Sequence, residues 1–543
     1  MLILLLSVWL TGCASLPSNV NRPVSTALAD PQSTRLGQLV QARAAKAGTH
    51  NDSGFALVED AQLAFTTRMA MIKAAQKTLD IQYYAIFADD TTDRMFDALR
   101  EAAGRGVRVR ILLDDFNTSG KNAQVLKLAF ENNMELRLFN PIPGGRGSMV
   151  LRILSNLKDV ARMQRRMHNK MMVADNAVAI TGGRNLGETY FGQSEGTNFV
   201  DIDMLAAGRI VRDLSDSFDQ YWNHPLAYPA QSLMTLEQIE SLKPKPALDK
   251  PEDFARVIPT AAQLTTQDMN PTTTERVAKR PDGAVVVIPA LPDTSDEGLL
   301  SWTWAPSVLL VDEPSKIAAD VDSVEEAEET TVDGLLQVMS QAKRELLIVS
   351  PYFVPGQRMM NTFAELRRRG VRVRVLTNSL ASNDAPAAHV GYARYREALL
   401  GLGVELYEMR AEQEGTLRDL SWLNGGSIGG STGGSRASLH AKVVVMDQRL
   451  LVVGSMNLDL RSQLQNSEVA LVIRSRSLSQ QAERLIEPAL SQGAYHVEKV
   501  DGQLVWRAPS GSSLKDTRTE PDASLPLRLL VKLFGPFAPD EML

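Results

Sequence analysis

The sequence predicts an α/β protein built from two duplicated lobes, because two separate patterns occur twice along the chain. The pattern His-x-Lys-x4-Asp occurs at residues 168–175 and again at residues 440–447. A helix, a glycine and an alternating strand recur around Gly106 and around Gly370, which lie 264 residues apart (370 − 106). Since helices and strands alternate in both copies, we expect an internal duplication that folds into two α/β lobes.

Length and composition predict a globular protein of two domains with connectors. At 543 residues the chain is too long for one ordinary core. Its hydrophobic content of 44% and charged content of 22% are those of a folded protein. The formal net charge of −6 gives no support to a nucleic-acid-binding protein, which usually carries a broad basic face.

The N-terminal residues have the pattern of a bacterial lipoprotein signal. Residues 1–9 are almost wholly apolar, and residues 10–13 match the lipoprotein cleavage box around Cys13, the single cysteine of the chain. So short an apolar run cannot span a bilayer but suits a signal peptide. We therefore expect a signal peptide at 1–12 and lipidation of Cys13, with a lipidated N-terminus and tether over 13–53. Within it, residues 14 to about 34 are rich in Pro, Ser and Asn, which predicts a flexible segment. By resemblance to enterobacterial sorting, Ala14 favours a periplasm-facing lipoprotein of the outer membrane.

Lobe 1 is expected over residues 54–242. The spacing of apolar residues predicts a helix over 67–77 and an amphipathic helix over 92–103, which Gly104 and Gly106 stop. Strands are predicted over 79–84 and, from strict alternation, over 107–112.

Residues 243–325 are expected to connect the lobes, and their first part is dense in Pro, Thr, Lys and Asp. The apolar part near Trp302 and Trp304 either packs on a lobe or lines an acyl-chain groove. Lobe 2 is expected over 326–500, with a helix over 363–369 and a strand over 371–376.

Two further stretches leave alternatives open. The Gly/Ser-rich stretch over 424–438 is either a lid over the site or an unstructured insertion. A C-terminal tail is expected over 501–543, and its apolar run over 525–534 either lies in a membrane interface or docks on the body of the protein.

The two His-containing segments have the composition of buried strands with polar side chains at their start. In each, an apolar stretch, most clearly Val443-Val444-Val445, follows a His and a Lys that lie two residues apart. Residues two apart on a strand point to the same side, so the imidazole and the ammonium face one pocket. The alternative is a core strand with a hydrogen-bonded His, which two copies with equal downstream spacing disfavour.

A small-residue turn follows each segment at the same distance. Its first glycine lies 14 residues after the His in both copies (182 − 168 and 454 − 440). Asn185 and Asn457 each lie 17 residues after the His of their own copy (185 − 168 and 457 − 440). The glycines let the backbone approach a bound group closely, and the Asn amides can donate to an oxyanion.

With their flanks, these segments resemble the phospholipase D superfamily, whose two-lobed members carry the same motif twice. The resemblance extends from about residue 60 to about residue 500. The flanks at 165–167, 457–462 and 466–468 are most similar to the bacterial cardiolipin synthases, particularly the C-type members. The resemblance implies two phospholipase D-like lobes, each a mixed sheet flanked by helices, with the active site at their pseudo-twofold interface.

The resemblance also implies how the site works. One imidazole attacks phosphorus to form a phosphohistidine and the other protonates the leaving oxygen, with His168 favoured as nucleophile and His440 as acid. Lys170, Lys442 and the two Asn amides would stabilise the non-bridging oxygens. No metal or cofactor is required. A further group of basic residues either binds anionic headgroups or forms a solvated helix face: Arg152, Lys158, Arg162, Arg165 and Arg166.

Carboxylates complete the expected site. A nucleophilic imidazole needs an acceptor for its far nitrogen. Glu468 matches the carboxylate of the superfamily that has this role, and in lobe 1 Asp201 is the best match, with Asp203 as its competitor. Asp175 and Asp447 belong to the motif but are expected to be structural.

The acceptor of the phosphatidyl group determines the activity. Transfer to the headgroup hydroxyl of phosphatidylglycerol would form cardiolipin, whereas transfer to water would make the protein a phospholipase D. A nuclease would use the same His pair but is expected to show a broad basic groove. A binding protein with a dead site is expected to have lost a motif residue, and none is lost. We therefore expect a cardiolipin-forming phosphatidyltransferase whose partners are membrane phospholipids and the bacterial membrane surface, with no nucleic acid.

Overall fold

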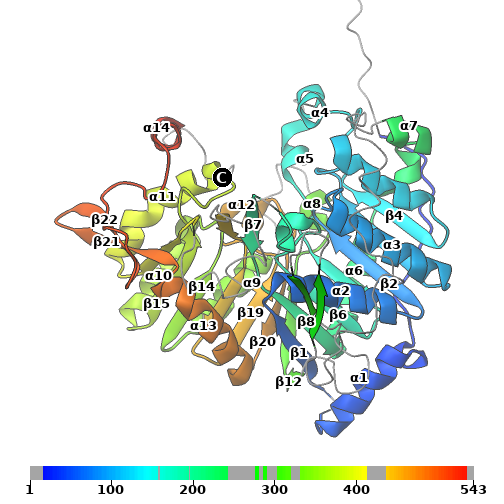
Figure 1. Ribbon diagram of the computed structural model, residues 1–543, viewed down its shortest axis with the longest axis horizontal. Helices are drawn as coiled ribbons and strands as arrows, with labels where there is room; N and C mark the ends of the chain where they lie inside the picture. The colour runs from blue at the N-terminus through cyan, green and yellow to red at the C-terminus, as the bar shows by residue number, and fades with distance from the viewer. Residues whose placement is uncertain are drawn as a thin grey trace, which may run out of the picture.

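The computed structural model describes most of the chain and confirms the predicted fold class. Two lobes lie side by side, lobe 1 in blue to green and lobe 2 in yellow-green to red (Figure 1). The predicted signal peptide with Cys13, most of the connector and residues 424–435 of the Gly/Ser-rich stretch lie outside the described residues. Those residues are 16–49, 51–156, 159–194, 196–241, 275–279, 285–289, 302–318, 330–412 and 436–534.

Lobe 1 is built on a mixed nine-stranded sheet. The neighbours β2, β3 and β4 run parallel, and the other neighbouring pairs are antiparallel. Nearly every residue of the parallel strands is buried, as expected of strands covered on both faces. The strand order is β12 (Thr303–Ala305), β1 (Ser53–Val58), β8 (Asp203–Gly208), β6 (Val178–Gly182), β5 (Met171–Ala174), β2 (Thr78–Tyr83), β3 (Arg108–Asp114), β4 (Met134–Phe139) and β9 (Ala227–Pro229).

Lobe 2 repeats this arrangement. Its strands β14, β15 and β16 run parallel and correspond to β2, β3 and β4. With the edge strands β12 and β22 set aside, the two sheets match strand for strand, so the predicted duplication is confirmed. The strand order is β13 (Ser307–Val311), β20 (Val469–Ile473), β19 (Leu450–Gly454), β18 (Val443–Met446), β14 (Glu345–Val349), β15 (Arg372–Asn378), β16 (Glu405–Met409), β21 (Ala494–Val500) and β22 (Gln503–Arg507).

Helices form layers outside and between the sheets. The helices α2 (Ala61–Ala74) and α3 (Asp90–Gly104) cover the outer face of lobe 1. The helices α9 (Thr331–Ser340), α10 (Gly356–Arg368) and α11 (Pro386–Gly401) do so for lobe 2. Between the sheets, α6 (Arg209–Trp222) and α13 (Arg476–Ser491) bury apolar residues in one core that draws on both lobes.

The remaining elements are short and lie mostly in connections. They are η1 (Pro31–Ser33), α1 (Arg35–Lys46), η2 (Gly120–Phe130), α4 (Met149–Ser155), α5 (Val160–Gln164), η4 (Glu188–Tyr190), β7 (Thr197–Val200), η5 (Ala230–Ser232), α7 (Leu236–Ser241), β10 (Glu275–Lys279), β11 (Val285–Pro289), α8 (Ser315–Ala318), β17 (Arg436–Leu439), α12 (Leu460–Leu464) and α14 (Leu525–Phe534).

Capping residues explain where the helices begin. The Asp60 carboxylate accepts the N–H of Leu63, so α2 begins at Ala61, earlier than the residue 67 that apolar spacing predicts. A capping box between Asp89 and Thr92 begins α3. Apolar spacing therefore predicts the helices, while polar caps set their first residues.

Two short backbone pairings join the lobes. The strand β7 of lobe 1 pairs in parallel with β17 of lobe 2, which places Val200 opposite Leu439. An isolated bridge joins Met167 of lobe 1 to Ser467 of lobe 2. Each pairing thus aligns the residue before a motif His with the residue before a predicted carboxylate, and it sets the register between the lobes.

The end of the connector adds an edge strand to each sheet. The strand β12 pairs with β1 of lobe 1 and β13 pairs with β20 of lobe 2, with Pro306 alone between them. Trp302 and Trp304 pack on Gly54 of β1, where an added Cβ would lie 3.0 Å from the Trp302 ring. Of the two expectations for these tryptophans, packing on a lobe is confirmed.

The N-terminal segment departs from the prediction of a tether over 13–53. The N–H groups of Ser25 and Ala27 donate to the side chains of Asn223 and Asp219, at 3.1 and 2.7 Å. The helix α1 then contacts β6 and β8 of lobe 1. The prediction is wrong for residues 25–46, because a Pro- and Ser-rich composition does not reveal hydrogen bonds to distant side chains.

The predicted boundary between lobe 2 and a C-terminal tail at residue 500 falls inside a hairpin. The strands β21 and β22 pair across it and extend the sheet of lobe 2. The Trp506 indole N–H donates to Glu408 at 2.8 Å, and the Arg396 guanidinium donates to Glu520 at 2.9 Å. The tail is therefore bound to lobe 2.

Of the helices in the described ranges, none combines the length and apolarity that crossing a bilayer requires.

Removing the carboxylate of Asp175 will cost more stability than removing that of Asp447. Asp175 is buried and accepts the N–H groups of residues 76–78, whereas Asp447 accepts those of residues 343–345 nearer the surface. Both residues have a left-handed backbone, with φ of 51° and 52°, so Ala adds the same strain to both. In urea denaturation, Asp175→Ala should lose about 2–4 kcal/mol of unfolding free energy and Asp447→Ala about 1 kcal/mol. Equal losses would contradict this account.

Candidate active site

The two motif histidines lie where the lobes meet, each shortly before a strand of its sheet. The His168 N–H donates to the Ser467 carbonyl at 2.9 Å, and the His440 N–H donates to the Val200 carbonyl at 2.8 Å. The backbone of each His is therefore held by the opposite lobe. Both side chains are buried where the lobes meet.

Each imidazole is also oriented by a carboxylate of the opposite lobe. His168 Nδ1 lies 3.0 Å from both carboxylate oxygens of Glu468, and His440 Nδ1 lies 2.7 Å from Asp201 Oδ2. Because an ionised carboxylate only accepts, Nδ1 carries the hydrogen and Nε2 keeps its lone pair for chemistry. Asp203, the expected competitor, pairs instead with Arg68 at 2.9 Å.

The small-residue turns accommodate these carboxylates. A Cβ on Gly183 would lie 2.5 Å from the Asp201 carboxylate, so only glycine fits there. In lobe 2 the corresponding position is Ser455, whose hydroxyl donates to Glu468 at 2.5 Å. A second hydroxyl, that of Ser462 in α12, donates to the same carboxylate at 2.8 Å. The bound group that these turns approach is thus the carboxylate that orients the imidazole.

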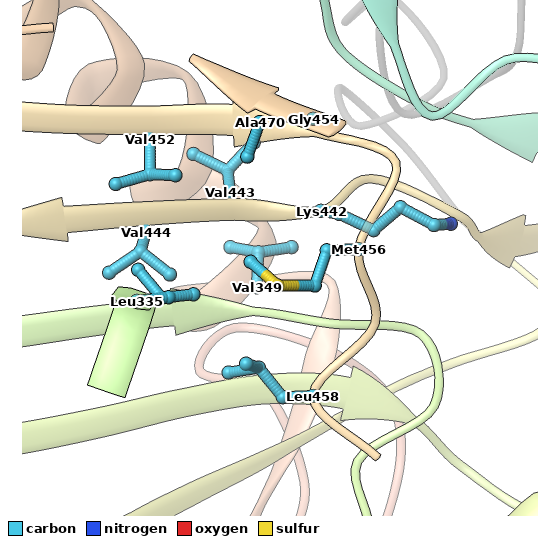
Figure 2. A pocket seen from close by; sticks show the side chains of 10 residues that line it. All are labelled: Leu335, Val349, Lys442, Val443, Val444, Val452, Gly454, Met456, Leu458 and Ala470. Carbon is cyan, nitrogen blue, oxygen red and sulfur yellow. The ribbon is translucent and has the colours of Figure 1, made fainter. Parts of the chain in front are cut away.

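The motif lysines lie beside the histidines, buried at the bottom of the site. Lys170 Nζ donates to the His168 carbonyl at 2.8 Å, and Lys442 Nζ donates to the His440 carbonyl at 2.6 Å. Figure 2 shows the Lys442 amine pointing away from a small pocket whose lining is otherwise apolar, including Val444. The amine lies instead beside His440, with Nζ 3.2 Å from His440 Nδ1.

The two Asn residues differ in their surroundings. Asn185 accepts the Ala85 N–H at 3.2 Å and donates to the Tyr190 hydroxyl at 3.0 Å, which leaves it one further amide hydrogen. The side-chain oxygen of Asn457 is buried without a hydrogen-bond partner. Contact of either amide with a substrate oxygen stays a prediction.

The motif carboxylates lie far from the chemistry. Asp175 and Asp447 follow the far ends of β5 and β18, and their hydrogen bonds go to the backbone that begins β2 and β14. They tie neighbouring strands together, in keeping with the structural role expected from the sequence.

Aromatic rings that the sequence did not single out pack against the imidazoles. The Tyr84 ring meets His168 edge-on at 5.0 Å between centroids, and Tyr190 meets His440 in the same way at 5.2 Å. Phe199 lies 5.0 Å from His440 and stacks on Tyr190. These rings exclude water from the cleft and restrict rotation of the imidazoles. Of these rings, only that of Tyr84 could have been found from the sequence, because Tyr84 ends a predicted strand.

A second pair of residues missed in the sequence holds the segments before the histidines. Asp114 ends β3 and its carboxylate accepts the Met167 N–H at 2.9 Å. Asn378 ends β15 at the equivalent position and its side-chain oxygen accepts the Leu439 N–H at 2.9 Å. The signal was present, since both are polar residues at the ends of the repeated strands.

Two of the basic residues expected to bind headgroups are buried in ion pairs instead. Arg152 pairs with Asp115, and Arg166 lies 3.5 Å from Asp114. Both guanidinium groups are fully buried. The headgroup interpretation is therefore wrong for these two, and Lys158 lies outside the described residues.

Burial keeps both imidazoles neutral in the free protein. It lowers the pKa of His168 to about 4, against the opposing effect of Glu468. Burial and the charges of Lys442 and Lys170 lower the pKa of His440 well below its ordinary value. Burial raises the pKa of Glu468, but His168 and Lys170 outweigh it and hold that pKa below its ordinary value. A neutral imidazole beside an ionised carboxylate is the state that a nucleophile requires.

This arrangement fits phosphoryl chemistry between two imidazoles. The two imidazoles and the two lysine amines are buried where the lobes meet, and in so water-poor a setting electrostatic contacts to a phosphate are strengthened. Burial lowers the pKa of both lysines. Among the residues that the structure describes, no three His, Cys, Asp or Glu side chains converge as a metal site would require.

Comparison with known proteins assigns the chain to a family. A family model described as cardiolipin synthase, PLD-like domain, matches residues 69–222 and 335–489, one match in each lobe. The chain belongs to the cardiolipin synthase family of PLD-like proteins. Cardiolipin synthase C of Escherichia coli is 36% identical over 479 residues, covering 87% of this chain and 92% of the relative. An uncharacterized protein of Helicobacter pylori is 29% identical, covering 97% of both chains. The resemblance drawn from the motifs is confirmed.

A solved structure supports the fold of this family member. The crystal structure of phosphatidylserine synthase from Haemophilus influenzae superposes with a TM-score of 0.53 at 14% identity, covering 91% of this chain and 97% of that one. The likeness extends over both lobes, so the two-lobed arrangement is that of a known architecture.

Asp201→Asn and Asp203→Asn form a matched pair, since the residues lie two positions apart and only Asp201 touches an imidazole. We expect Asp201→Asn to lower kcat by about 10²–10⁴-fold with the fold retained, because an amide no longer stabilises the imidazolium. Asp203→Asn should lower the melting temperature but leave kcat of the folded protein within about threefold, because it removes an ion pair with Arg68. Equal losses of kcat would remove Asp201 from the site.

The depressed pKa of His168 predicts an unusual pH dependence. The imidazole is neutral above its pKa of about 4 and is protonated, hence unreactive, below it. We expect kcat/KM to show no loss as the pH falls through about 6.5, the ordinary pKa of His, and to decline only near pH 4. A pH profile measured with circular dichroism as a folding control checks this. A decline centred at the ordinary value would contradict it.

Proposed function

We propose that this protein is a phosphatidyltransferase that forms cardiolipin from phospholipids through a phosphohistidine intermediate. The observation that carries the proposal is the crossed pair of imidazoles and carboxylates, complete in both lobes. Its likeness to cardiolipin synthase C of Escherichia coli supports the substrate class. The alternative is a phospholipase D that transfers the same group to water.

In the first half-reaction the protein releases the headgroup of the donor lipid. His168 Nε2 attacks phosphorus, a P–N bond forms, and the bond from phosphorus to the headgroup oxygen breaks. His440 takes up a proton at Nε2 from solvent when the anionic substrate binds and gives it to that oxygen, so that a neutral alcohol leaves. Lys170 and Lys442 stabilise the negative charge on the non-bridging oxygens.

In the second half-reaction the phosphatidyl group passes to the acceptor. The headgroup hydroxyl of phosphatidylglycerol loses its proton to His440 and attacks phosphorus, while the P–N bond to His168 breaks. A P–O bond replaces it and cardiolipin leaves. The assignment of His168 as nucleophile is supported by its partner, because the pKa of Glu468 is held low and that of Asp201 is raised by burial.

Lipid analysis and trapping test the proposal together. Protein incubated with labelled phosphatidylglycerol should produce cardiolipin and free glycerol by mass spectrometry, whereas phosphatidic acid as the main product would identify a hydrolase. His168→Ala and His440→Ala should each lower turnover by at least about 10⁴-fold. Labelled phosphoryl enzyme should accumulate in His440→Ala and be absent in His168→Ala. Trapping in His168→Ala would reverse the two roles.

We also propose that the protein is a lipoprotein anchored through Cys13, facing the periplasm from the outer membrane. The cleavage box around Cys13 and the apolar run before it support this. Labelled fatty acid should be incorporated into the protein in bacterial cells, and Cys13→Ser should abolish the incorporation. Sedimentation of the labelled protein with the inner membrane would contradict the proposed location.

A further inference from the structure

The C-terminal helix α14 presents an apolar stripe to solvent. Its inner side packs through Leu527 and Val531 on a buried apolar cluster of lobe 2 that includes Leu380 and Ala411, so its outer side has a defined direction. The outer side carries three residues one helical turn apart that are largely exposed: Leu525 at 72%, Leu529 at 56% and Leu533 at 64%.

The helix α4 of lobe 1 also has one side held against the protein and an exposed apolar side. Its Arg152 is buried and donates to Asp115 and to the Ile142 carbonyl, which fixes the orientation of the helix. The opposite side of α4 carries three exposed apolar residues: Val150 at 66%, Leu151 at 68% and Leu154 at 56%. Together these three residues and the three leucines of α14 are called the docking face below.

The duplication places the two halves of the docking face in equivalent positions. Arg152 of α4 is bound to Asp115 and Ile142, which follow the carboxyl ends of β3 and β4. The helix α14 packs on Leu380 and Ala411, which follow the carboxyl ends of the corresponding strands β15 and β16.

Positions related by a twofold axis lie at the same height on opposite sides of that axis. Here the axis passes between the crossed histidine–carboxylate pairs, so the two helices flank the catalytic cleft. Figure 1 shows both at the upper edge of the molecule, with β7 and α12 of the site between and below them.

The charge of these helices indicates what covers them. Residues 525–534 include Arg528 and Lys532 and no Asp or Glu, and residues 149–155 also lack an acidic residue. Two separated apolar patches at one height suit a single extended surface better than a compact partner. Apolar side chains with neighbouring cations are typical of helices that lie in the interface of an anionic bilayer.

We propose that the docking face seats the catalytic cleft on a bilayer that contains anionic phospholipid. This inference rests on the proposed function, since a lipid substrate must offer its phosphodiester while its acyl chains stay in the membrane. The proposed anchor at Cys13 lies nine residues before Arg22, which stacks on Tyr228 of lobe 1 (22 − 13). That length reaches at most about 30 Å, so the anchor keeps the protein near the bilayer and the docking face orients it.

A single-cysteine label tests the contact directly. The chain has one cysteine, so Cys13→Ser provides a background for single labels. In it, Ser155→Cys at the last residue of α4 and Ser524→Cys directly before α14 each carry one polarity-sensitive fluorophore. Ala42→Cys is the control, because it is an exposed position on α1 and that helix lies at the lower edge of Figure 1. With vesicles of phosphatidylglycerol and phosphatidylcholine, emission should shift to shorter wavelength for the labels at 155 and 524 and stay unchanged at 42. An equal shift at all three positions, or none at 155 and 524, overturns the proposal.

Substitution of the docking face tests whether the leucines carry the affinity. Leu525, Leu529 and Leu533 changed together to Ser should weaken the apparent affinity of the label at 155 for these vesicles at least about tenfold. Val308→Ser, which replaces an exposed apolar residue of β13, is the matched control and should leave it unchanged. Dissociation of a protein dimer by the triple substitution would identify a second copy as the occupant and overturn the proposal.

Measuring catalysis in parallel distinguishes failure of the docking-face proposal from failure of the proposed phosphatidyltransferase function. The ratio of the rate on vesicles to the rate on dispersed short-chain phosphatidylglycerol should fall at least about tenfold in the triple variant. An unaltered ratio overturns the docking face while the proposed function stands. A parent protein that binds vesicles through this face but transfers no phosphatidyl group overturns the proposed function instead.

Discussion

The crossing of the histidine–carboxylate pairs is the constraint on which the rest of the structure depends. Each imidazole is supplied by one lobe and oriented by a carboxylate of the other, at 3.0 Å for His168 with Glu468 and 2.7 Å for His440 with Asp201. The cross-lobe pairing of β7 with β17, the Met167–Ser467 bridge and the shared core all serve this alignment. A lobe by itself has a reactive imidazole without its acceptor.

The balance of charge explains how one imidazole becomes an acid. Burial lowers the pKa values of Lys170 and Lys442 and raises that of Asp201, so the buried site of the free protein resists carrying net charge. A phosphodiester brings one negative charge into this low-dielectric cleft. The site then favours uptake of one proton, which is the proton that the leaving oxygen needs. The depressed pKa values of the free protein are thus compatible with acid catalysis once substrate is bound.

Much of the site could be predicted because the chain contains it twice. Equal spacing identified His168, His440 and the small-residue turns, and strand alternation predicted the helix–glycine–strand unit. The crossing could not be predicted, since spacing along a chain reports on local neighbours and the pseudo-twofold exchanges partners between lobes. The sequence also could not show that Arg152 neutralises a buried Asp115, because the identity of an arginine does not reveal whether its side chain is buried or exposed. The competition between Asp201 and Asp203 needed the structure for the same reason: alternate residues on one extended segment have similar surroundings until the partner lobe is in place.

The link between β12 and β13 has a consequence for how such a duplication can evolve. These strands close the edges of two different sheets, yet Pro306 is all that separates them. The one-residue link at Pro306 fixes the distance between the two edge strands, so we expect insertions in the connector before β12 to be tolerated far better than insertions at Pro306. Each sheet is thereby held at a fixed offset from the other, so this link restricts the relative placement of the two copies.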